Sequence, residues 1–111
     1  MKMLLLLLSI ILFVVLAPIG FLFGLIRNIV NLNDYFFKIA ICIDQAGNVI
    51  CAPLFNVILI TQHGYEFGDE DETISGVLGK NKKSNTLSKA GWMLANLLNK
   101  IEKDHVEKAI E

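Results

Sequence analysis

Four titratable residues of this chain form the one group that could hold a metal ion or move protons as enzymes do. They are Asp69, Asp71, Glu72 and His105. Carboxylates combined with an imidazole can bind a divalent cation or act as general acid and base. The three acidic residues lie in one block, but His105 is far along the chain and nothing in the spacing brings it to them. We therefore take these four as candidate site residues, with no cofactor or metal assigned.

The known motifs for calcium binding, phosphate binding and nucleophilic catalysis are not completed in this part of the chain. The acidic block has no glycine at the turn position of a calcium loop. Gly79-Lys80 does not complete a phosphate loop, because Ile74 stands where glycine is needed and Asn81 where Ser or Thr is needed. Ser75 has no evident base or oxyanion partner. The sequence thus favours helix caps and a solvated surface over an active site, and favours a protein that is not an enzyme.

Any site must be positioned by the elements around it, and the first of these is an apolar run from Met3 to Ile26. This run contains no charged side chain. At about 1.5 Å per residue, a helix of this length reaches the roughly 30 Å of a bilayer's hydrocarbon core. A cleaved signal peptide, cut after Ala17, is the rival interpretation. Because the apolar stretch continues well beyond Ala17, we expect an uncut transmembrane helix.

The membrane is thus the first expected partner, and a second copy of the chain is another candidate. Gly20 and Gly24 have the small-xxx-small spacing that lets two transmembrane helices approach closely. This spacing predicts self-association, although glycine is also common in such helices for other reasons.

The segment 29–61 is apolar with helical periodicity but is interrupted. Pro53 breaks a second apolar run, and Gly47-Asn48 has the composition of a turn. Three structures are compatible with this pattern: an interrupted amphipathic helix, interfacial or packed on the protein, a second transmembrane pass, or a β-hairpin about Gly47-Asn48. We favour the helix, because a second pass places Asp44 near the middle of the bilayer.

The segment 62–111 predicts a small helical soluble region. A short helix is expected to begin at Asp71 or Thr73 and to end at Gly79. A longer amphipathic helix is expected with Thr86 as its N-cap, and we assign it the role of binding an unknown protein partner. Asp104 and Glu107 have the spacing of a capping box for a final turn. Cys42 and Cys51 are expected to be buried and reduced.

The predicted fold class is all-α: an N-terminal transmembrane helix, amphipathic helices and a small helical C-terminal region. The expected divisions are a transmembrane anchor at 1–28, the amphipathic or apolar segment at 29–61, and the soluble region at 62–111. The net charge is −1, and the acidic block and the lysines that follow it are each short. Without aromatic residues among those lysines, the sequence predicts no binding of nucleic acid.

A set of residues in the second half of the chain resembles a group of small proteins found in bacteriophages and prophages. The resemblance covers about residues 44–111 and has a D-E-T-I-S core and a C-terminal helix ending near a histidine. The chain departs from the group at Glu70, where proline is usual, and at Val106, where cysteine often follows the histidine. The residues that carry the resemblance are Asp44-Gln45, Gly47-Asn48, Gly68 to Ser75, Gly79-Lys80, His105 and Ala109.

The resemblance implies a protein of phage origin, located in the bacterial inner membrane and acting by interaction in lysis or in superinfection exclusion. Two alternatives remain open: a small metal-dependent or acid–base enzyme that uses the acidic cluster and His105, and a holin-like pore former. The lysines after the acidic block weakly favour a cytoplasmic C-terminal region.

Overall fold

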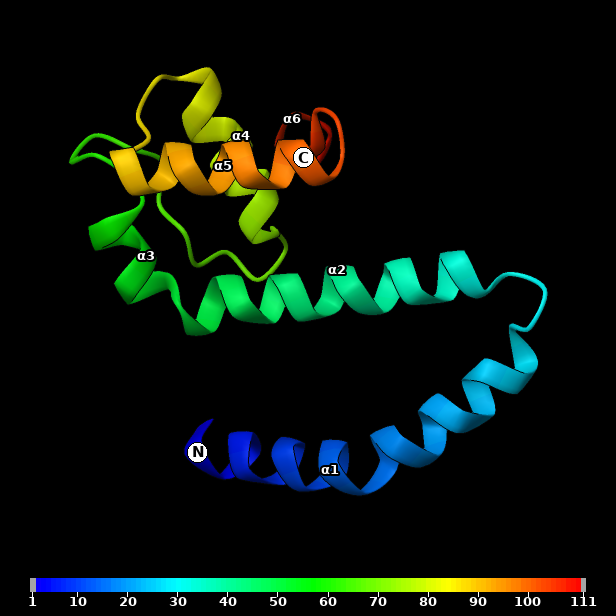
Figure 1. Cartoon of the computed structure of the whole chain (residues 1–111). Coiled ribbons are helices and arrows are strands. Elements are labelled where there is room, and N and C mark those ends of the chain that lie inside the picture. The colour runs from blue at the N-terminus through cyan, green and yellow to red at the C-terminus, as the bar shows by residue number, and fades with distance from the viewer. Residues whose placement is uncertain (1, 111) are drawn as a thin grey trace. The chain divides into compact units, whose positions relative to one another are not determined.

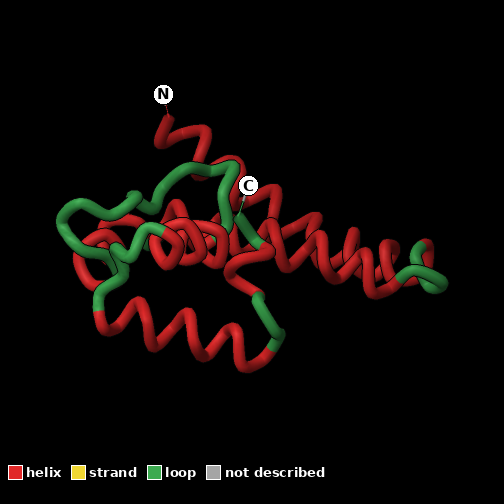
Figure 2. Tube along the Cα trace, turned by 90° about the horizontal axis from the view of Figure 1, so that it is seen from above, coloured by secondary structure: helices red, strands yellow, loops and turns green. Residues whose placement is uncertain are grey.

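The computed structural model describes residues 2–110, and these form six helices and no strand (Figures 1 and 2). The predicted all-α class is confirmed. The helices are α1 (Lys2–Arg27), α2 (Leu32–Ile50), α3 (Ala52–Ile58), α4 (Ile74–Lys83), α5 (Lys89–Ile101) and α6 (His105–Lys108).

The chain divides into two compact units, Met1–Lys38 and Ile39–Glu111, so that the division falls inside α2. In the first unit, α1 is long and apolar enough to cross a membrane, and its most apolar stretch is not buried within the protein. Asn28 donates both its backbone amide and its side-chain amide to the carbonyl of Gly24, at 2.9 and 2.8 Å, at the end of this helix.

Gly24 allows Tyr35 to pack against α1 within this first unit. A Cβ atom at Gly24 would lie 2.0 Å from the Tyr35 hydroxyl oxygen, whereas the corresponding position at Gly20 is open. The Tyr35 ring also stacks on Phe21, with ring centroids 6.1 Å apart. Gly24 is therefore covered by the same chain, and self-association through Gly20 and Gly24 would require Tyr35 to move.

The core of the second unit forms where α4 packs against α5 and α6. Val77, Leu78, Ala95 and Val106 are fully buried there. Gly79 makes this packing possible, because a Cβ atom on it would lie 2.1 Å from the backbone oxygen of Val106. The predicted end of this helix at Gly79 is wrong: α4 begins after its N-cap Thr73, as expected, but continues to Lys83.

The segment 29–61 follows the interrupted-helix prediction. α2 runs through Gly47-Asn48 to Ile50, and α3 follows Cys51 at an angle of 75°. The β-hairpin is therefore wrong. Asn48 stays helical because its side chain, which could have favoured a turn, instead bonds to a distant loop. Cys42 and Cys51 are free thiols, but neither is buried as predicted: Cys42 is exposed and Cys51 is half-buried.

The two C-terminal helix starts also differ from the sequence prediction. Ser88, not Thr86, is the N-cap of α5, and its hydroxyl accepts the Gly91 amide at 3.1 Å. Thr86 donates its hydroxyl to Asn81, because the next residue, Leu87, pairs with Ile60 in an isolated bridge. Asp104 is the N-cap of α6, as predicted, but it lies in the left-handed region with φ of 58° and its side chain makes no capping bond, so the predicted capping box is absent.

Candidate functional site

Side chains from the second half of α2 hold the backbone of the acidic block in place. Asn48 is fully buried and donates to the carbonyls of Asp69 and Glu72 at 2.8 and 2.9 Å. Gln45, one turn earlier, donates to the carbonyl of Asp71. The loop therefore owes its shape to amide side chains that satisfy its backbone.

The predicted site residues fall into separate places. Carboxylate oxygens of Asp69, Glu70 and Asp71 lie within 4.8 Å of one another, and all three residues are exposed. Within residues 2–110, neither Glu72 nor His105 joins this group. Exposed carboxylates at this spacing are common on solvated surfaces, so the cluster by itself does not indicate a metal site.

Glu72 is buried and serves as a partner for two side chains. It accepts a hydrogen bond from the Tyr65 hydroxyl and forms an ion pair with Lys80. The Lys80 ammonium also lies 4.5 Å from the centroid of the Tyr65 ring. The hydrogen bond to Glu72 raises the pKa of both Tyr65 and Lys80. This arrangement fixes the loop onto α4 and leaves Glu72 unavailable as a ligand.

His105 lies against α4, in contact with a residue that the sequence left without a partner. Its Nε2 atom is 3.0 Å from the Ser75 hydroxyl oxygen, and its Nδ1 atom is 2.9 Å from a carboxylate oxygen of Glu102. The hydrogen bond to His105 holds the pKa of Glu102 below its ordinary value. Ser75, His105 and Glu102 thus stand in the order of nucleophile, base and orienting acid.

Asp44 completes this group from α2. One of its carboxylate oxygens accepts the Ile74 amide at 2.8 Å, and the other lies 3.4 Å from the Ser75 hydroxyl oxygen. We call Asp44, Ser75, Glu102 and His105 the Ser75 cluster. Three of its four members, Asp44, Ser75 and His105, belong to the residues that carry the phage-protein resemblance. Spacing gave no signal for this cluster, because its members meet across 30 or 31 positions of the chain.

The Ser75 cluster is built to hold helices together rather than to attack a substrate. Ser75 is only 4% exposed. A carboxylate next to its hydroxyl also opposes the negative charge that an attacked carbonyl would develop. The cluster instead satisfies polar groups from α2, α4 and the α6 region in a partly buried place, where unpaired groups are costly.

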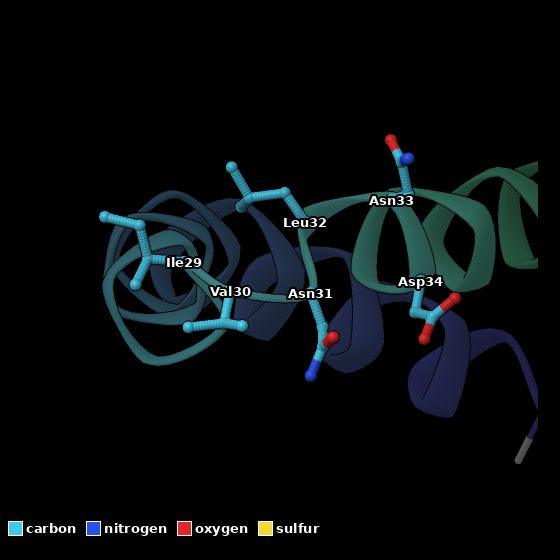
Figure 3. Close-up of a pocket in the computed structure, with 6 residues that line it drawn as sticks. All are labelled: Ile29, Val30, Asn31, Leu32, Asn33 and Asp34. Carbon is cyan, nitrogen blue, oxygen red and sulfur yellow. The ribbon is translucent and has the colours of Figure 1, made fainter.

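A pocket of about 310 Å³ lies at the link between α1 and α2 and is lined by residues 29–34 (Figure 3). In this view Asn31 and Asp34 point to one side of the backbone, and Leu32 and Asn33 point to the other. The polar groups therefore do not converge on one point, and the pocket has no arrangement for chemistry.

The comparisons with known proteins do not extend these observations. No protein-family model, curated protein or solved structure matches the chain. The functional conclusion therefore depends on the residues and contacts described above.

Proposed function

We propose that this protein is a phage-type protein of the bacterial inner membrane that acts by interaction, in host-cell lysis or in superinfection exclusion. The observation that carries the proposal is a helix of membrane-spanning length, uncharged from residue 3 to residue 26, followed by a small folded unit with an unpartnered helix face. The resemblance of residues 44–111 to small phage and prophage proteins is the basis for the proposed origin.

The unpartnered face belongs to α5 and comprises Met93, Leu97 and Ile101. These residues are 73%, 55% and 76% exposed and recur at intervals of four on one side of the helix. α5 contains no acidic residue, and Lys89 and Lys100 are exposed on it. An apolar centre with cationic neighbours suits a protein partner that offers an apolar groove bordered by carboxylates.

The test is expression of the full chain in a host during phage infection. We expect it to change either the time of lysis or the plating efficiency of a second phage. The double variant Leu97→Asn, Ile101→Asn is expected to lose this effect while its level in carbonate-washed membranes is unchanged. Lys83→Asn, an exposed substitution on α4, is the matched control. Absence of any effect of the unmodified chain, or its release by carbonate, would contradict the proposal.

Two further variants separate the proposal from the enzyme and pore alternatives. Asp71→Asn changes an exposed carboxylate of the acidic cluster without disturbing the buried pair of Glu72 and Lys80. Loss of function in Asp71→Asn at an unchanged membrane level would favour an enzyme or metal protein. Dye leakage from vesicles that contain the purified chain would favour a pore former.

A further inference from the structure

The bend between α2 and α3 presents an outer surface that is both apolar and uncharged. From Gln45 to Tyr65 the chain has no Asp, Glu, Lys or Arg. We call residues 43–58 the elbow. Its exposed large side chains are all apolar, and they are Ile43, Val49, Ile50, Leu54, Val57 and Ile58, with exposed fractions from 42% to 78%.

The polar side chains of the elbow all point inward to partners of the same unit. Asp44 accepts from the Ile74 amide, and Asn48 donates to the 69–72 loop. Asn56 donates to the Phe67 carbonyl and accepts the Phe67 amide. This distribution is the inverse of a water-facing surface, on which the polar groups would point outward.

Several backbone groups of the elbow also have partners within the protein at the bend and at the end of α3. The Cys51 and Phe55 amides donate to Gly47 and Cys51, across the bend. At the end of α3, Ser88 donates its hydroxyl to the Ile58 carbonyl at 2.6 Å and its amide to the Leu59 carbonyl at 3.0 Å. A helix end can enter hydrocarbon only if such groups have partners within the protein.

We propose that the outer face of the elbow inserts into one leaflet of the bilayer and holds the second unit on the membrane surface. This inference uses one part of the proposed function, namely that α1 anchors the protein in the membrane. Four residues, 28–31, separate α1 from α2, so a bilayer crossed by α1 is within reach of α2. α2 and α3 together are also apolar enough to enter a membrane as a bent pair.

The insertion is shallow and is not a second pass. The seven residues of α3 rise by about 10 Å, which is less than the thickness of one leaflet. A complete crossing by α2 and α3 would also carry Asp44, with its bonded loop, into the hydrocarbon. The bonds from Gln45 and Asn48 to the 69–72 loop, and from Asp44 to the start of α4, therefore keep this face of α2 against the protein while the elbow's outer face meets lipid.

The experiment uses the full chain in vesicles of phosphatidylethanolamine and phosphatidylglycerol, with Cys42 and Cys51 replaced by alanine. Val57→Cys places a thiol on the outer face of the elbow, where the side chain is 78% exposed in the protein alone. Ser84→Cys, a near-isosteric change at the exposed end of α4, is the matched control. Circular dichroism establishes that both variants keep the helical fold.

We expect a membrane-impermeant maleimide to label Ser84→Cys and to leave Val57→Cys unlabelled until detergent is added. An environment-sensitive dye on Val57→Cys should show a blue shift and should be quenched by lipids brominated on their acyl chains. Equal labelling of the two thiols would overturn the proposal, because the outer face of the elbow would then be exposed to water and free to bind a protein partner. Protection that disappears when the protein is diluted in lipid would overturn it in favour of a second copy.

Lys38→Cys and Gln62→Cys test the shallow insertion against a second pass. These positions precede and follow the elbow, and both are exposed. Shallow insertion predicts that the maleimide reaches both from the same side of the membrane as Ser84→Cys, whereas labelling from opposite sides would overturn the proposal. Carbonate extraction reports separately on the α1 anchor, so that a failure of the proposed function is distinguishable from a failure of the elbow.

Discussion

Ser75 has neighbours of the types found in catalytic sites, but its contacts stabilise the fold. Its hydroxyl lies between the Asp44 carboxylate and the His105 imidazole in an almost fully buried position. Removing the hydroxyl leaves both neighbours with one partner fewer, but Asp44 and His105 are partly exposed and can bond to water, so the loss is that of a typical hydrogen bond, about 0.5–1.5 kcal/mol.

Ser75→Ala should therefore lower the free energy of unfolding by about 0.5–1.5 kcal/mol. Denaturant unfolding of the full chain in detergent, followed by Trp92 fluorescence, measures the change. Ser84→Ala, at an exposed position, should leave stability unchanged. Covalent labelling of Ser75 by a fluorophosphonate would contradict the structural role and favour a nucleophile.

The ion pair of Glu107 with Lys82 makes the stability of the folded protein depend on pH in the acid range. The hydrogen bond from Lys82 lowers the pKa of Glu107 below the ordinary value of 4.5. Because the folded protein then binds this proton more weakly than the unfolded chain, the stabilisation is present above pH 4.5 and is lost as the pH falls through the lower, folded-state pKa. Glu102, paired with His105, shifts in the same direction.

Glu107→Gln should consequently flatten the decrease in melting temperature between about pH 5 and pH 3, relative to the unmodified chain. The effect is expected to be small, because the Glu107 side chain is 39% exposed and solvent screens the pair. Thermal unfolding at a series of pH values measures it, with Glu66→Gln as the exposed control. An unchanged pH profile in Glu107→Gln would show that the pair does not contribute.

At the scale of helices, close approach between α4 and α6 depends on the glycines of α4. Alanine is the better helix former by about 1 kcal/mol, so propensity alone predicts that Gly79→Ala is stabilising. The new Cβ atom would meet the Val106 backbone oxygen at 2.1 Å, which the packed core cannot relieve without separating the helices. The clash therefore outweighs the gain in propensity.

Gly79→Ala should destabilise the second unit by about 1–3 kcal/mol, the cost of overpacking a core. Gly47→Ala is the matched control, since its Cβ atom would meet only the flexible end of Ile74 at 3.1 Å. Denaturant unfolding should show a large loss for the first variant and a small change for the second. Equal effects would mean that α6 is not packed against Gly79.

The helices themselves were largely predictable, and their ends were not. The uncharged run of α1 and the Thr73 cap of α4 depend on nearby residues, so the sequence pattern identified them. Gly79 was taken as a helix end because glycine commonly stops helices, but here it is needed inside α4 for packing. Likewise, Ser88 replaces Thr86 as the cap because the pairing of Leu87 with Ile60 keeps Thr86 outside the helix.

The candidate site was less predictable than the fold. The acidic block was found by composition, yet its shape depends on Asn48 and Gln45, which are distant in sequence. The pairing of Ser75 with His105 joins helices that only the packing of the core brings together. Contacts of this kind leave no periodic pattern in the chain, so residue spacing could not have revealed them.

For the whole molecule, one pass by α1 and a shallow elbow predict that the two chain ends lie on opposite sides of the membrane. We propose that the second unit is cytoplasmic, and we therefore expect a C-terminal tag to be protected in intact spheroplasts and an N-terminal tag to be cleaved by added protease. Cleavage of both tags, or protection of both, would indicate an even number of crossings.

The contacts between the end of α3 and the start of α5 give the second unit a mechanical property. Ser88 holds the carbonyls of Ile58 and Leu59, and Gly91 lets α5 approach the Leu59 backbone. These hydrogen bonds and this close approach join the end of α3 directly to the start of α5. If the elbow inserts as proposed, a tilt of α3 in the bilayer would therefore also displace α5, on which the proposed partner surface lies.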